Sequence, residues 1–93
     1  MTDKTLTIRL AEVADTHALA RLAALDSSSP PTGAALVAEV GDELWAAIEI
    51  DSGTAIADPF RPSGEVVDLL RLHANEGVRR ERRAFARVLP RAA

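Results

Sequence analysis

The chain has 93 residues, 47% hydrophobic and 27% charged, which fits one folded domain with a single core and argues against disorder. It contains no cysteine, which excludes disulfides, thiolate metal sites and a cysteine nucleophile. The net charge of −3 is unevenly divided: residues 1–70 carry four basic and twelve acidic side chains (−8), and residues 71–93 carry seven basic and two acidic ones (+5).

The first part of the chain predicts a strand followed by a helix. Residues 5–10 alternate β-branched or polar with aliphatic side chains, which is typical of a short strand. Apolar residues then recur at helical spacing over residues 14–25, with Asp15 and Thr16 as candidate capping residues. Two prolines, three serines and a glycine in residues 26–33 end this helix and predict the longest loop.

The middle of the chain predicts three antiparallel strands joined by tight turns. Aliphatic runs at residues 35–40 and 44–50 are separated by Gly41 and Asp42, a pair that suits a two-residue hairpin turn. A second turn leads to a last strand at residues 54–57. The strand order predicts an α/β (α+β) domain with a four-stranded, mainly antiparallel sheet.

The remaining residues predict two helices. In the first, residues 65–74, Ser63 is placed to cap the start, and Val66, Leu69, Leu70 and His73 share the buried face. Residues 75–77 (Asn-Glu-Gly) are typical of a helix end, because glycine adopts the left-handed cap conformation easily. A separate Arg-rich helix or tail then follows, so the expected division is a domain at residues 1–77 and a tail at residues 78–93.

The element order resembles the first half of the GNAT family of acyl-CoA-dependent N-acyltransferases. The residues that carry the resemblance are 7–11 (TIRLA) with the helix after them, the hairpin at 36–44 (LVAEVGDEL) and 57–59 (ADP) at the end of the fourth strand. The resemblance spans about residues 5–74. It implies a half-GNAT-like β-α-β-β-β-α fold. Separately, one lysine against ten arginines is typical of a GC-rich bacterial genome.

The same resemblance implies a coenzyme-binding loop at residues 61–66. The family pattern there is Arg/Gln-x-x-Gly-x-Gly/Ala, whose backbone N–H groups and following helix hold the coenzyme A pyrophosphate. Arg61, Ser63 and Gly64 are the candidate cofactor-binding residues, as a degenerate phosphate loop for acetyl-CoA. Pro62, Glu65 and Val66 depart from the pattern by removing an amide donor, adding negative charge and adding bulk. A strand-to-helix turn explains the same residues, so we expect no cofactor.

No residues are assigned a catalytic or metal-binding role. The family's later strands and its usual tyrosine have no counterpart in these 93 residues, which contain no tyrosine, so we expect a chain that is not an enzyme. His17 and His73 lack metal-ligand spacing with acidic residues, and residues 27–29 (three serines) lack the flanking motif of a nucleophile. No segment approaches the roughly 20 apolar residues of a membrane span, and no signal peptide is evident, which predicts a cytoplasmic protein.

Two functions remain open. The first is a non-catalytic GNAT-like module that acts by self-association, as a homodimer, or by binding a protein partner, through the edge of the 54–57 strand, the 78–89 segment or both. The alternative is a residual acyl-CoA binder or N-acyltransferase completed by another chain. They differ in whether acetyl-CoA raises the melting temperature. The arginines at 79–91 favour contact with an acidic protein face over nucleic acid, because the rest of the chain is acidic.

Overall fold

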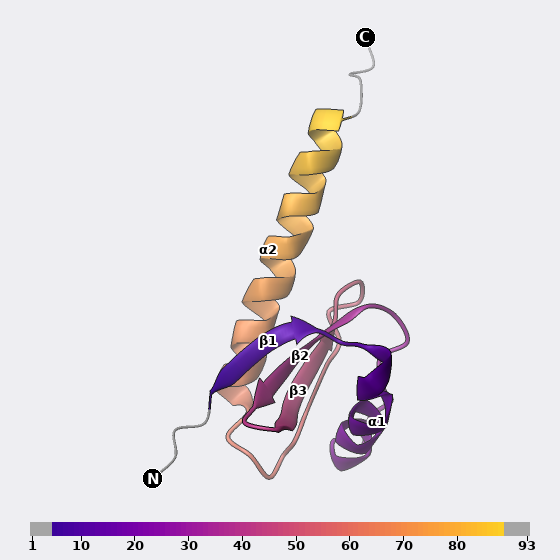
Figure 1. Cartoon of the computed structure of the whole chain (residues 1–93), viewed down its shortest axis with the longest axis vertical. Helices are drawn as coiled ribbons and strands as arrows, with labels where there is room; N and C mark the ends of the chain where they lie inside the picture. Colours follow the sequence, from indigo (N-terminus) through magenta and orange to yellow (C-terminus); the bar gives the residue numbers. More distant parts are fainter. Residues whose placement is uncertain (1–4, 89–93) are drawn as a thin grey trace.

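The computed structural model describes residues 5–88, and of residues 77–88 it describes the backbone. The chain forms an α+β domain in which a four-stranded antiparallel sheet is covered by a helix on each face (Figure 1). In chain order the elements are β1 (Leu6–Leu10), the 3-10 turn η1 (Val13–Asp15), α1 (Thr16–Leu25), β2 (Ala35–Val40), β3 (Glu43–Glu49), β4 (Ala55–Ala57) and α2 (Gly64–Val88).

The sheet has the strand order β1-β2-β3-β4, and all its neighbours are antiparallel. The strands predicted at residues 5–10, 35–40, 44–50 and 54–57 are confirmed to within one residue or two at their ends. Gly41 and Gly53 take φ angles of 64° and 74°, so glycine relieves the strain that another side chain would meet in these two turns. Turn chemistry and the aliphatic pattern together therefore set the order of β2, β3 and β4.

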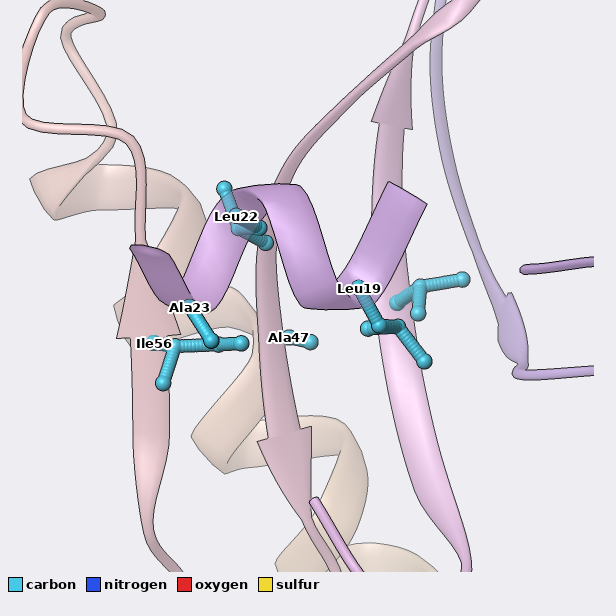
Figure 2. Close-up of a cluster of buried hydrophobic side chains, with 6 residues drawn as sticks. Leu19, Leu22, Ala23, Ala47 and Ile56 are labelled. Carbon is cyan, nitrogen blue, oxygen red and sulfur yellow. The ribbon is translucent and has the colours of Figure 1, made fainter. Parts of the chain in front are cut away.

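Helix α1 packs on one face of the sheet. Its buried residues Leu19, Leu22 and Ala23 fall at helical spacing, so they form one stripe, and they contact buried side chains from β2, β3 and β4 (Figure 2). This face is built from small and aliphatic side chains alone: Leu19, Leu22, Ala23, Val37, Ala47 and Ile56.

Helix α2 packs on the opposite face through its first half. Val66, Leu70 and Ala74 are spaced by four residues, are buried, and lie against Ala46 and Ile48 of the sheet. Leu70 is 0% exposed. Arg71 connects one side of α2 to the turn between β3 and β4, because its guanidinium Nη1 donates to the Gly53 carbonyl oxygen at 3.2 Å.

A β-bulge in β3 decides which side chains reach which face. Ala38 pairs with Ala46 and Glu39 pairs with Leu44, so Trp45 is the extra residue on β3. The extra residue breaks the alternation of the strand, and both Trp45 and Ala46 pack on the α2 side, while Leu44 packs on the α1 side. The bulge thus allows a large aromatic ring to join an otherwise aliphatic core.

The predicted helix end at Asn75–Gly77 is wrong. Helix α2 continues without interruption from Gly64 to Val88, over 25 residues. At about 1.5 Å per residue it is about 37 Å long, whereas the longest strand, the seven residues of β3, spans about 23 Å. The helix therefore runs well past the sheet, and the molecule is elongated, with a long axis of 58 Å (Figure 1).

The predicted buried face of α2 needs a correction as well. His73 is exposed, and its Nδ1 lies 2.9 Å from the Leu69 carbonyl oxygen of the preceding turn. Leu69 is 37% exposed. The buried stripe is therefore Val66, Leu70 and Ala74, with Val67 partly buried beside it.

Candidate functional site

The loop between β4 and α2 contains Arg61 and Ser63, two of the residues predicted to bind a cofactor, and leads into the third, Gly64. Several backbone amides of this loop donate hydrogen bonds to acceptors within the loop. The Asp58 carboxylate accepts a hydrogen bond from the Phe60 amide at 2.8 Å, and the Asp58 carbonyl accepts one from the Arg61 amide at 3.3 Å. The Ser63 amide donates to the Arg61 carbonyl at 2.7 Å. Three amides of this loop are thus engaged within it, and an anion bound there would have to displace these contacts.

Arg61 lies between a carboxylate and an aromatic ring. Its Nη2 lies 2.9 and 2.8 Å from the two carboxylate oxygens of Glu43, and its guanidinium carbon lies 5.6 Å from the centre of the Trp45 ring. The bulge on β3 positions the ring, and the hairpin turn before it positions Glu43. The arrangement ties the loop to the sheet through charge pairing and cation–π attraction.

Ser63 and Gly64 stand at the start of α2 in different roles. The Ser63 carbonyl accepts the first helical hydrogen bond, from the Val67 amide at 2.9 Å, and the buried Ser63 hydroxyl donates to the Asp58 carbonyl at 3.0 Å. The hydroxyl therefore links the helix start to the end of β4. Gly64 is exposed, and a Cβ built on it would meet nothing within 4 Å, so no close packing requires glycine there.

Arg61, Ser63 and Gly64 are thus brought together in one loop, but Arg61 faces Glu43 rather than the helix start. The buried Nε1 of Trp45 has no hydrogen-bond partner among the residues that the structure describes. The geometry supports a connection that holds α2 against the sheet.

A pocket of about 180 Å³ lies beneath the Pro-rich loop, between Pro30, Pro31, Thr54 and Ile56, whereas ligand sites usually enclose at least about 300 Å³. Within residues 5–88 no cluster of three or more His, Asp or Glu side chains is arranged to hold a metal ion. In the same residues no helix has the length and apolar character of a membrane span.

The two edges of the sheet differ as places for pairing with another chain. Strand β4 has three residues, and one of its backbone donors, the Ala57 amide, is taken by the Asp26 carboxylate at 3.2 Å. Strand β1 is longer, and Leu6 and Leu10 are exposed. The predicted pairing edge is therefore short and partly covered by the end of α1.

Helix α2 divides into two halves of opposite charge. Residues 64–76 carry Glu65, Asp68 and Glu76 against Arg71, which is −2, and each of these four residues is exposed. The sequence places five arginines and one glutamate in residues 77–88, which is +4. The first half also exposes Leu69 and Leu72, with Leu72 58% exposed. One continuous helix thus combines an acidic half with exposed leucines and a basic half.

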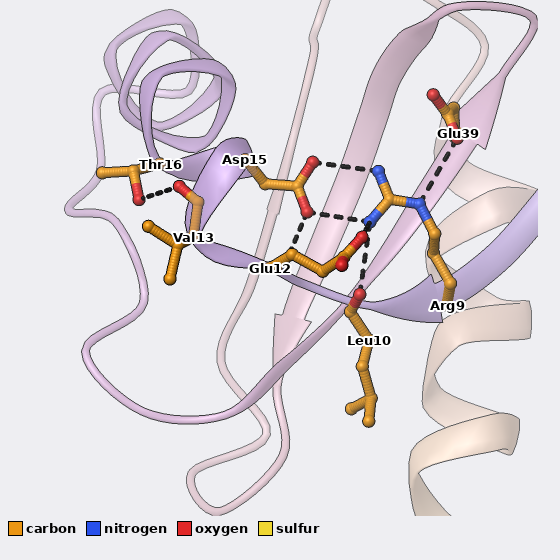
Figure 3. A network of polar contacts seen from close by, with 7 residues as sticks. All are labelled: Arg9, Leu10, Glu12, Val13, Asp15, Thr16 and Glu39. Carbon is orange, nitrogen blue, oxygen red and sulfur yellow. Dashed lines mark hydrogen bonds and ion pairs between the residues drawn. The ribbon is translucent and has the colours of Figure 1, made fainter.

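Two polar networks that sequence reasoning missed fix the elements around these surfaces. Arg9 of β1 binds both carboxylate oxygens of Asp15, at 2.8 and 2.9 Å, and its Nε lies 3.4 Å from the Glu39 carboxylate on β2 (Figure 3). The hydrogen bonds from Arg9, with one from the Glu12 amide, hold the pKa of Asp15 at about 2, below its ordinary 3.8. The network fixes the entry of α1 against the sheet. The Asp15 carboxylate, predicted to cap α1, makes no capping hydrogen bond to that helix and binds Arg9 and the Glu12 amide instead.

The second network joins the Pro-rich loop to the β3–β4 turn through Glu49. Its carboxylate accepts hydrogen bonds from the Ser52 hydroxyl, from the Thr32 and Gly33 amides at 3.0 and 2.9 Å, and from the Thr32 hydroxyl. These donors, the Ser52 hydroxyl first, lower the pKa of Glu49 to about 2. Nothing local in the sequence links Glu49 to Thr32, since the contact joins segments 17 residues apart.

Comparisons of the chain with protein-family models, curated proteins and solved structures found no match.

Proposed function

We propose that the chain is a non-catalytic, GNAT-like small domain that acts by self-association. The observation that carries the proposal is the continuation of α2 beyond the sheet, from about residue 77 to Val88 (Figure 1). A helical extension of about 12 residues gains little stability from backbone hydrogen bonds alone, and most helices in proteins are stabilised by packing. A contact with another molecule supplies that packing.

The charges support a second copy of the same chain as that molecule. Residues 1–70 are acidic, with a net charge of −8, and residues 77–88, which extend past the sheet, are basic, with +4. Opposite charges steer two copies together and disfavour contact between like regions. No catalytic residue is assigned, and the loop with Arg61, Ser63 and Gly64 is given the role of joining α2 to the sheet.

Sedimentation equilibrium tests the proposal. The chain has a mass of 9.9 kDa, and we expect the weight-average mass to rise toward about twice this value as the concentration increases. A mass of one chain at every concentration up to the millimolar range would contradict self-association.

A matched pair of substitutions locates the contact. Leu72 on α2 and Leu10 on β1 are 58% and 60% exposed, so Leu72→Glu and Leu10→Glu add the same charge at equally accessible positions. We expect Leu72→Glu to weaken the dimer, because it places an unpaired charge in an apolar contact. Leu10→Glu leaves the mass unchanged if α2 carries the contact, and dissociates the dimer if β1 does.

A further inference from the structure

Helix α2 is the surface from which the geometry of the dimer can be inferred, provided that the proposed self-association holds. We infer that two copies pair with their α2 helices antiparallel, so that the acidic half of each helix lies along the basic half of the other. This arrangement names the partner surface of the dimer and its orientation.

The charge changes sign along α2, which is one unbroken helix. Residues 64–76 carry −2 and residues 77–88 carry +4. In a parallel pair, each half would lie beside a half of the same sign, and like charges at close range repel. In an antiparallel pair both contacts are attractive, and a two-fold axis near the middle of the helix relates them.

The first half of α2 also has an exposed flank. Leu69 and Leu72 lie on the side of α2 away from Arg71, whose guanidinium reaches toward the β3–β4 turn. Glu65 and Glu76 fall on the same flank as these leucines, since residues 65, 69, 72 and 76 are separated by three or four positions. An apolar strip with an acidic residue at each end is therefore open on α2, and the antiparallel partner would place arginine-rich helix against it.

The same separation of charge has a second physical effect, within a single chain. Acidic residues near a helix N-terminus and basic residues near its C-terminus stabilise the helix through its dipole. That effect needs no second copy, so the decisive experiments measure orientation between chains and the charge dependence of the dimer.

Cysteine cross-linking measures the orientation, on a background that contains no cysteine. The middle of α2, between residues 64 and 88, is residue 76, so in an antiparallel pair Glu76→Cys lies near its own copy, and residue 65 lies near residue 87. A disulfide needs Cα atoms within about 7 Å. We expect Glu76→Cys to form a disulfide-linked dimer on oxidation, Glu65→Cys alone to remain unlinked, and a mixture of Glu65→Cys with Arg87→Cys to give the mixed dimer.

The possible results separate the two proposals. Efficient linking of Glu65→Cys to itself would show a parallel pair, and a dimer by sedimentation without any of these links would place the contact elsewhere, for example at β1. Either result overturns the antiparallel inference and leaves self-association intact. A monomer by sedimentation overturns both.

Charge reversal with a matched control tests the electrostatic part. Glu65→Lys with Asp68→Lys reverses two exposed charges in the acidic half of α2, and Asp42→Lys with Asp51→Lys reverses two exposed charges in the turns of the sheet. The first double variant alters four cross-helix contacts in a symmetric dimer, so we expect its dissociation constant to rise by about tenfold or more. The control should leave it within about twofold. An equal change in both variants would show that net charge alone matters, and would contradict the inference.

Discussion

Helix α2 joins two regions of the molecule: residues 64–76, which pack on the sheet, and residues 77–88, which extend past it. In residues 64–76 every fourth side chain is buried against the sheet, and Arg71 and the Ser63 loop add hydrogen bonds to the body. Residues 77–88 continue the same helix past the last strand (Figure 1). The comparison shows that α2 is longer than the sheet surface against which its first half packs.

The largest effect on stability is expected from truncating a side chain of α2 that is buried against the sheet. Leu70→Ala removes a fully buried side chain, and the cavity and lost burial should lower the free energy of unfolding by about 2–5 kcal/mol. Leu72→Ala, on the exposed side of the same turn, should cost well under 1 kcal/mol in a monomeric sample at low concentration. Urea denaturation followed by Trp45 fluorescence measures both variants, and equal losses would contradict the burial that separates them.

Acid should lower the free energy of unfolding by protonating the carboxylates of Asp15 and Glu49. Asp15 and Glu49 both have folded pKa values of about 2, below their ordinary 3.8 and 4.5, so the unfolded chain binds more protons between about pH 4.5 and pH 2. Their stabilisation is complete above about pH 4.5 and is lost as the pH falls through 2. In Asp15→Asn we expect the free energy of unfolding near pH 7 to fall by about 1–3 kcal/mol, with a shallower decline in acid.

That experiment also separates the two regions. Trp45 fluorescence reports the body, and circular dichroism reports α2 in addition. A variant whose acid unfolding curve had the same slope as the unmodified chain would show that the Arg9–Asp15 contacts contribute nothing to the acid dependence.

The smallest effect concerns the junction between the two regions. Gly77 lies inside α2, where glycine costs about 0.5–1 kcal/mol relative to alanine, so Gly77→Ala should raise helical content and stability by up to that amount. If the helix instead ended there in a left-handed cap, alanine would be strained and the same change would destabilise the protein. Thermal unfolding followed by circular dichroism distinguishes the two signs, with Ala84→Gly as the reverse control.

Local patterns were sufficient for the sheet and for α1. Alternation over residues 5–10, the aliphatic runs, and the glycine turns predicted every strand, because a strand's pleat and a turn's backbone angles are properties of a few neighbouring residues. The candidate loop was located correctly as the connection into α2. Its contacts were not predictable, since Arg61 meets Glu43 and Trp45 only after the sheet has formed.

The sequence by itself determined the strands, the turns, the burial of Val66 and Leu70 on α2, and the charge difference between the two ends of the chain. Only the tertiary structure decided that Asn75–Gly77 lies inside a helix, that His73 is exposed, and that Glu49 holds the Pro-rich loop. The physical reason is that glycine is permitted in both conformations, and inside a helix it costs only about 1 kcal/mol relative to alanine. Packing of the helical turns before Gly77 against the sheet is enough to favour a continuous helix. As a result, the acidic residues of 64–76 and the arginines of 77–88 lie on the same helix.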